Sequence, residues 1–136
     1  MGDAAARGAQ LDAWRAVAGG WERRRALVWD ATREVSERLV ALLDPAPGDD
    51  LLEVAAGPGD TGLLAAAHVA PDGRLLSTDG VPQMVDAARR RAAELGLDNV
   101  DFAVADAAEL GLPAASFDGV LCRFGVMLVP DCDAAV

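Results

Sequence analysis

The chain contains no lysine and no tyrosine, and it has one histidine and two cysteines among its 136 residues. A single histidine excludes a metal site built from several imidazoles, so we expect no metal. Two cysteines do not make a disulfide framework, and this usage favours a reducing, cytoplasmic location. No apolar run approaches the roughly 20 residues that a membrane-spanning helix needs.

Positive charge is also scarce, because 12 basic residues face 22 acidic ones and the net charge is −10. This balance argues against a general affinity for nucleic acid or anionic membranes. The hydrophobic fraction of 52% and the length of the chain predict one globular domain with a sizeable core. All the basic residues are arginine and alanine is abundant, which we interpret as the codon bias of a GC-rich bacterial genome.

The most informative stretch is 51–62, an apolar run interrupted by Glu53 and followed by Gly57, Gly59 and Gly62. The run predicts a buried strand of a parallel sheet, and the helix-forming residues after the glycines predict a helix. A strand, a glycine turn and a helix together let a small ligand contact bare backbone beside a helix N-terminus. A carboxylate is costly to bury, so we expect Glu53 to face that ligand.

The rest of the chain alternates between helical and strand patterns, which predicts an α/β fold with a parallel sheet. We expect residues 1–10 to be frayed and a helical region over 11–43 that breaks near Gly19 and Gly20. Its tryptophans either anchor the helices on the sheet or form part of a lid over a ligand. Further helices are expected over 60–69 and 82–95, and further strands over 74–79 and 100–105. A last strand and its exit are expected within 116–128, with Cys122 inside the strand.

Asp79 ends the strand 74–79 about twenty residues after the glycine turn. A nucleotide-binding fold needs a carboxylate at this position, because it accepts hydrogen bonds from both ribose hydroxyls. The spacing Gly57-x-Gly59-x-x-Gly62 is also the fingerprint of dinucleotide binding. From these residues alone, an NAD-dependent oxidoreductase therefore stays an alternative.

Four features in order resemble the class I S-adenosylmethionine-dependent methyltransferases, closest to the type 11 and ubiquinone/menaquinone-biosynthesis-like groups. Stretch 51–62 resembles their first motif, although the family usually has glycine where this chain has Ala55. The segment 80–85 after Asp79 is similar to the second motif, in which a methionine packs against the adenine, although Met84 is equally plausible as a core residue. Asp106-Ala107 and the segment 117–120 continue the pattern.

The resemblance implies a Rossmann-like, doubly wound, mostly parallel sheet, of which this chain supplies strands one to four of seven. It implies an N-terminal helical lid over 1–45 and a cofactor-binding domain over 46–136 that is incomplete at its C-terminal side. We therefore expect the N-terminal part of a methyltransferase. Its fourth strand would be an exposed edge, which favours self-association and marginal stability.

The cofactor implied by the resemblance is S-adenosylmethionine, and the implied partner is a small-molecule acceptor. Arg123 is expected to form an ion pair with Glu53 or a nearby aspartate, and the alternatives are an acidic acceptor or the cofactor carboxylate. Methyl transfer needs mainly placement of the reactants, and no acid–base pair stands out in the sequence, so the catalytic residue stays unknown and we name none. A cofactor-binding fragment without activity is the remaining alternative. The implied cofactor-binding residues are Glu53, Ala55, Gly57, Pro58, Gly59, Asp79, Gly80, Met84, Asp106, Ala107 and Arg123.

Overall fold

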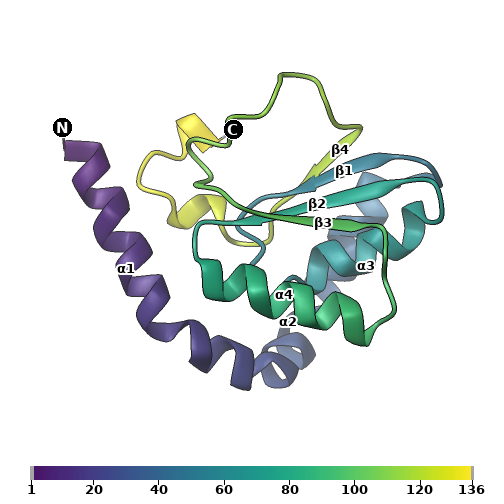
Figure 1. Ribbon diagram of the computed structural model, residues 1–136, viewed down its shortest axis with the longest axis horizontal. Helices are drawn as coiled ribbons and strands as arrows, with labels where there is room; N and C mark the ends of the chain where they lie inside the picture. Colours follow the sequence, from purple (N-terminus) through teal and green to yellow (C-terminus); the bar gives the residue numbers. More distant parts are fainter. Residues whose placement is uncertain (1, 136) are drawn as a thin grey trace.

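The computed structural model describes residues 2–135 as a four-stranded parallel sheet with four α-helices and two short 3-10 helices, shown in Figure 1. This arrangement confirms the predicted α/β fold. The strands lie in the order β3-β2-β1-β4, with every neighbouring pair parallel. The elements in chain order are α1 (Gly2–Arg23), α2 (Arg25–Leu43), β1 (Asp50–Glu53), α3 (Asp60–Val69), β2 (Arg74–Asp79), α4 (Pro82–Glu94), β3 (Val100–Val104), β4 (Gly119–Leu121), η1 (Val126–Leu128) and η2 (Asp133–Ala135).

The two faces of the sheet are covered differently. Helices α2, α3 and α4 lie against one face, below the sheet in Figure 1. The main core fills this side, and Leu51, Leu75 and Leu121 meet there from three strands. The irregular segment 105–118 crosses the other face, where Leu110 and Phe117 line a hollow together with Val54. None of the helices in 2–135 has the length and apolar character of a membrane span.

Helix α1 differs from the prediction at both ends. It begins at Gly2 instead of after a frayed segment, and it continues through Gly19 and Gly20 to end at Arg23. A glycine inside a helix costs only about 1 kcal/mol relative to alanine. The helix also has tertiary support, because its apolar side chains pack on α4. The side chains in this second cluster are Leu11, Trp14, Ala18, Trp21, Val81 and Met84.

All four strands run in the same direction, so their carboxyl ends meet at one edge of the sheet. Glu53 ends β1, Asp79 ends β2, and the segments after β3 and β4 leave from the same edge. Helix α1 passes beyond this edge, on the left of Figure 1. In open parallel sheets ligands bind in the crevice outside the carboxyl ends of the strands. The fold therefore places the candidate site between the sheet edge and α1.

Candidate functional site

A cavity of about 210 Å³ lies at this carboxyl edge. Its wall includes every cofactor-binding residue predicted from the sequence except Gly59. Gly59 is the N-cap of α3 with φ 89°, and a Cβ there would lie 2.8 Å from the Cβ of Ala88. Side chains from the two N-terminal helices and from the segment after β4 also line the cavity without having been predicted singly, among them Arg7, Leu11, Val28, Thr32, Phe124 and Leu128.

The turn between β1 and α3 has an unusual backbone. Ala55 has φ 52° and Gly57 has φ 57°, both in the left-handed region. A residue with a Cβ is strained there by roughly 1–2 kcal/mol, which explains why glycine suits this turn. The Cβ of Ala55 fits because the residue opposite, Gly125, has no side chain. A Cβ added at Gly125 would lie 2.5 Å from the Cβ of Ala55. The turn and the segment after β4 therefore pack closely beside the cavity.

Glu53 is only 2% exposed, and both of its carboxyl oxygens are used within the chain. Oε1 accepts a hydrogen bond from Gly62 N at 2.9 Å, and Oε2 accepts one from Ser77 Oγ at 3.3 Å. Burial raises the pKa of Glu53 to about 8, although these hydrogen bonds and the nearby Arg123 act in the opposite direction. Glu53 reaches the cavity wall as expected, but its carboxyl group mainly ties β1 to the first turn of α3.

Asp79 joins the glycine turn to the end of β2. Its Oδ2 accepts a hydrogen bond from Gly57 N at 2.8 Å, and its Oδ1 accepts one from Val81 N at 2.9 Å. Burial raises the pKa of Asp79, while the two backbone donors lower it. A carboxylate has about four lone-pair sites, so two acceptor positions are left for a ligand in the cavity.

The residues predicted to hold an adenine lie at the side of the cavity next to α1 and α4. Asp106 Oδ1 accepts a hydrogen bond from Ala108 N at 2.9 Å, which is the turn-capping role of an aspartate. Met84 is 5% exposed and belongs to the cluster under α1, and it also lines the cavity. At Gly80 an added Cβ would lie 2.5 Å from Leu11 Cδ2. The absence of a side chain at Gly80 therefore lets α1 approach the sheet edge.

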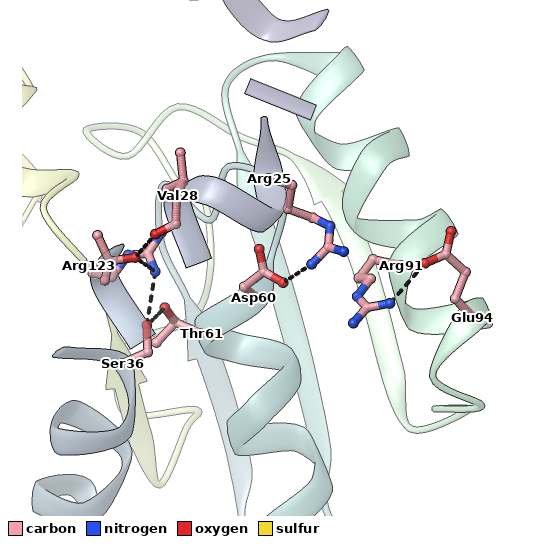
Figure 2. Close-up of polar contacts among 9 residues, drawn as sticks. Arg25, Val28, Ser36, Asp60, Thr61, Arg91, Glu94 and Arg123 are labelled. Carbon is pink, nitrogen blue, oxygen red and sulfur yellow. Dashed lines mark hydrogen bonds and ion pairs between the residues drawn. The ribbon is translucent and has the colours of Figure 1, made fainter. Parts of the chain in front are cut away.

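Arg123 was expected to pair with Glu53 or an aspartate, and this expectation is wrong. Its Nη1 donates hydrogen bonds to Thr32 Oγ1 and Ser36 Oγ, each at 2.9 Å. Figure 2 shows Arg123 beside Ser36. Within residues 2–135 no carboxylate lies within ion-pair distance of its guanidinium. Helix α2 passes close to the exit of β4 and presents hydroxyl groups there, so Arg123 is held by neutral oxygens.

Three ion pairs hold the N-terminal helices against the rest of the chain. On α1, Arg7 pairs with Glu109 at 2.8 Å and Glu22 pairs with Arg90 at 2.6 Å. On α2, Arg25 pairs with Asp60 at the start of α3, at 3.0 Å (Figure 2). The expected N-terminal helical region therefore borders the cavity, with Trp14 and Trp21 in its wall.

The family model described as a methyltransferase domain matches residues 51–136. The matched span starts at β1 and contains the glycine turn, Asp79 and the segment after β4. The chain belongs to the class I S-adenosylmethionine-dependent methyltransferase family. The alternative of an NAD-dependent oxidoreductase is thereby set aside.

Two curated relatives and one solved structure illustrate the likeness. The chain is 40% identical to nocamycin O-methyltransferase of Saccharothrix syringae over 82% of its own length and 41% of that protein. It is 35% identical to the aklanonic acid methyltransferase DauC of Streptomyces sp. (strain C5), over 75% of its own length and 46% of that protein. A SAM-dependent methyltransferase from Aquifex aeolicus matches with a TM-score of 0.67 at 21% identity, over 74% of this chain and 53% of that one, which shows the shared fold.

The chain spans less than half the length of these two curated relatives. The region matched by the family model, 51–136, contains all the cofactor-binding residues predicted from the sequence, whereas α1 and α2 supply part of the cavity wall from outside it.

Proposed function

We propose that this chain binds S-adenosylmethionine in the cavity at the carboxyl edge and serves in methyl transfer to a small-molecule acceptor. The single observation that carries the proposal is the position of Asp79. Its partly buried carboxylate is fixed by Gly57 N and Val81 N at the mouth of a glycine turn, with free acceptor positions on the cavity side. This is the arrangement that recognises a ribose diol next to a backbone-lined pocket.

The other residues of the cavity fit the remaining parts of the cofactor. The open backbone at Gly57, where no atom lies within 4 Å of an added Cβ, suits close approach of the methionine part. Asp106 and Ala107 suit the adenine, with Met84 packed against its ring. Glu53 would act by holding the turn, and a cation beside it, such as the cofactor ammonium, would favour the ionised form of its buried carboxyl group.

In this proposal the cofactor supplies an electrophilic methyl group on a sulfonium centre. The chain's own part is to bind, to orient and to exclude water. The apolar side chains of Leu11, Trp14, Val28 and Leu128 around the cavity would keep water away and pack against an apolar acceptor. The names of the two curated relatives, which specify nocamycin and aklanonic acid, support a small organic acceptor.

The decisive experiment is calorimetric titration of the chain with S-adenosylhomocysteine and, separately, with NAD. We expect saturable binding of S-adenosylhomocysteine only. Asp79→Asn should weaken it by about 10- to 100-fold, because one amide cannot replace the charged acceptor of two backbone donors and a diol. Asp72→Asn, which changes an exposed aspartate in the turn before β2, is the matched control. A folded chain that binds neither ligand would overturn the proposal.

We further propose that the chain works in a reducing cytoplasm, binds no nucleic acid and can pair with a second copy through β4. Both cysteines are free, which suits a reducing compartment, and the net charge of −10 opposes phosphate binding. β4 is an edge strand of the sheet, and Val120 in it and Phe124 and Met127 after it are 56%, 48% and 71% exposed. Sedimentation velocity over a range of concentrations tests the pairing, and a purely monomeric chain would contradict it.

A further inference from the structure

Arg123 is held in one orientation by two hydroxyl groups of helix α2. Thr32 gives its own hydrogen to Val28 O at 2.7 Å, so its oxygen is free to accept from Arg123 Nη1. Ser36 is fully buried and shares a hydrogen bond of 2.8 Å with Thr61 Oγ1 of α3. The two hydrogens on Nη1 are therefore both used, and the guanidinium plane is fixed (Figure 2).

The opposite edge of the guanidinium, formed by Nε and Nη2, has no partner among residues 2–135. In that part of the chain, Nε of Arg91 is the only buried side-chain nitrogen or oxygen that lacks a hydrogen-bond partner. Because Nε and Nη2 of Arg123 also lack partners, these two atoms are not buried and are accessible to a ligand. Arg123 also lines the cavity. A guanidinium edge with two parallel N–H groups matches the two oxygens of a carboxylate. The free edge of Arg123 is thus a pair of N–H donors with no acceptor among residues 2–135.

The charge of Arg123 is not balanced by its surroundings. Arg25, the other arginine near this end of α3, pairs with Asp60 and leaves no carboxylate of that turn for Arg123. Glu53 is the acidic group whose pKa Arg123 lowers, yet burial raises that pKa to about 8, so Glu53 is mostly protonated at neutral pH. Asp79 and Asp106 also line the cavity, but no carboxylate within residues 2–135 lies within ion-pair distance of Arg123. A cation without an ion-pair partner in a largely apolar cavity favours an anionic ligand.

The backbone beside Arg123 is strained in a way that supports a built site. Phe124 has φ 63°, in the left-handed region that a bulky residue rarely adopts. It lines the cavity, as does Ala55 with φ 52°. Strain of this kind persists where the surrounding structure fixes it, and it gathers at ligand-binding positions. The strain lies directly after Arg123 and sets the direction in which the chain leaves β4.

We propose that Arg123, positioned by Thr32 and Ser36, is the receptor for a carboxylate group of a ligand in the cavity. The inference deepens the proposed function and rests on it in one respect, namely that the cavity receives a cofactor and an acceptor. Two sources share this chemistry: the amino-acid end of the cofactor and an acidic acceptor. The charge and the free fork are the same for both, and the experiment separates them.

The test compares the wild-type chain with Arg123→Met and Arg123→Lys in two sets of calorimetric titrations. The first set uses S-adenosylhomocysteine and 5′-methylthioadenosine, which lacks the amino-acid part. The second set uses 2-naphthoate and its neutral counterpart 2-naphthamide, each with and without saturating S-adenosylhomocysteine. Arg38→Met, which removes an exposed arginine of α2, controls for the loss of one positive charge. Thermal melts monitor folding, and we expect Arg123→Met to fold because Thr32 and Ser36 keep their other hydrogen bonds.

If the carboxylate belongs to the cofactor, Arg123→Met weakens the binding of S-adenosylhomocysteine by about tenfold or more. The binding of 5′-methylthioadenosine is then unchanged. If it belongs to the acceptor, the wild-type preference for naphthoate over naphthamide disappears in Arg123→Met while S-adenosylhomocysteine binds as before. Arg123→Lys should restore only part of either effect, because an ammonium lacks the fork.

The proposal is overturned if a folded Arg123→Met chain binds all four compounds as the wild type does. It is equally overturned if the Arg38→Met control reproduces the losses, since these would then reflect net charge alone. If the wild-type chain binds no S-adenosylhomocysteine at all, the proposed function is contradicted. The naphthoate and naphthamide titrations without S-adenosylhomocysteine would still decide the role of Arg123.

Discussion

The cavity has two walls that are built in different ways. The wall formed by β1, α3 and the end of β2 is held by carboxyl groups that accept backbone hydrogen bonds, the buried one of Glu53 and the partly buried one of Asp79. The wall formed by α1 is held by apolar packing and by ion pairs between partly exposed side chains. Buried hydrogen bonds are costly to lose, whereas exposed ion pairs contribute little. The comparison teaches that the sheet-side wall is the rigid reference against which the α1 wall is placed.

The largest expected effect concerns the protonation of Glu53. Its folded-state pKa of about 8 lies above the ordinary 4.5, so the folded chain holds the proton more tightly than the unfolded chain. This contribution to stability is fully present below about pH 4.5 and is lost as the pH rises toward 8. We expect the unfolding free energy to fall by on the order of 4 kcal/mol across that window from this group. Urea unfolding at a series of pH values measures it.

Glu53→Gln should flatten this pH dependence, because the amide keeps the shape and does not titrate in the window. The exposed Glu34→Gln on α2 serves as the control and should leave the slope unchanged. An equal slope in the wild type and in Glu53→Gln would show that the sheet-side wall does not depend on a buried proton.

The next largest effect is expected from Gly62→Ala. An added Cβ at Gly62 would overlap Glu53 Oε2 and lie 3.0 Å from Leu75 Cδ2. The buried carboxyl group would have to move and lose its hydrogen bond from Gly62 N, which we expect to cost about 3 kcal/mol. Urea unfolding measures the change. Gly8→Ala in α1, where no atom lies within 4 Å of the new Cβ, should be neutral or slightly stabilising. Equal effects at the two glycines would remove the distinction between the walls.

The smallest effect is expected from the ion pair between Glu22 and Arg90, whose side chains are 43% and 57% exposed. Glu22→Gln, Arg90→Gln and the double variant form a cycle, and we expect a coupling energy of about 0.5 kcal/mol or less. Urea unfolding of the four chains gives the value. A coupling energy well above 1 kcal/mol would mean that α1 is fixed by charge, and the contrast with the sheet-side wall would fail.

The sheet and the sheet-side wall were predictable because their signals are local. The buried run before the glycines, the helix Asp60–Val69 and the strand Arg74–Asp79 lie where the sequence pattern predicted them. The position of Asp79 opposite the glycine turn follows from parallel strands meeting at one edge. That Asp79 would also hold Gly57 N was not visible, because this contact depends on the path of the turn.

The α1 wall and the partners of Arg123 were less predictable because they depend on contacts between distant segments. Gly19 and Gly20 suggested a break that the packing of α1 on α4 overrides. Arg123 was singled out by its place near the end of a strand, but its partners lie 91 and 87 residues away on α2. No periodicity in the sequence says which face of α2 meets β4, so the hydroxyl pair could not be foreseen.

The two backbone hydrogen bonds of Asp79 have a consequence for affinity. A free aspartate side chain loses rotational freedom when a ligand captures it, and that entropy loss weakens binding. Here Gly57 N and Val81 N already hold both oxygens, so the carboxylate is immobilised when the chain folds. A ligand hydroxyl group that docks there meets a pre-organised acceptor. The entropy of this side chain is lost when the chain folds, so its ordering does not weaken ligand binding.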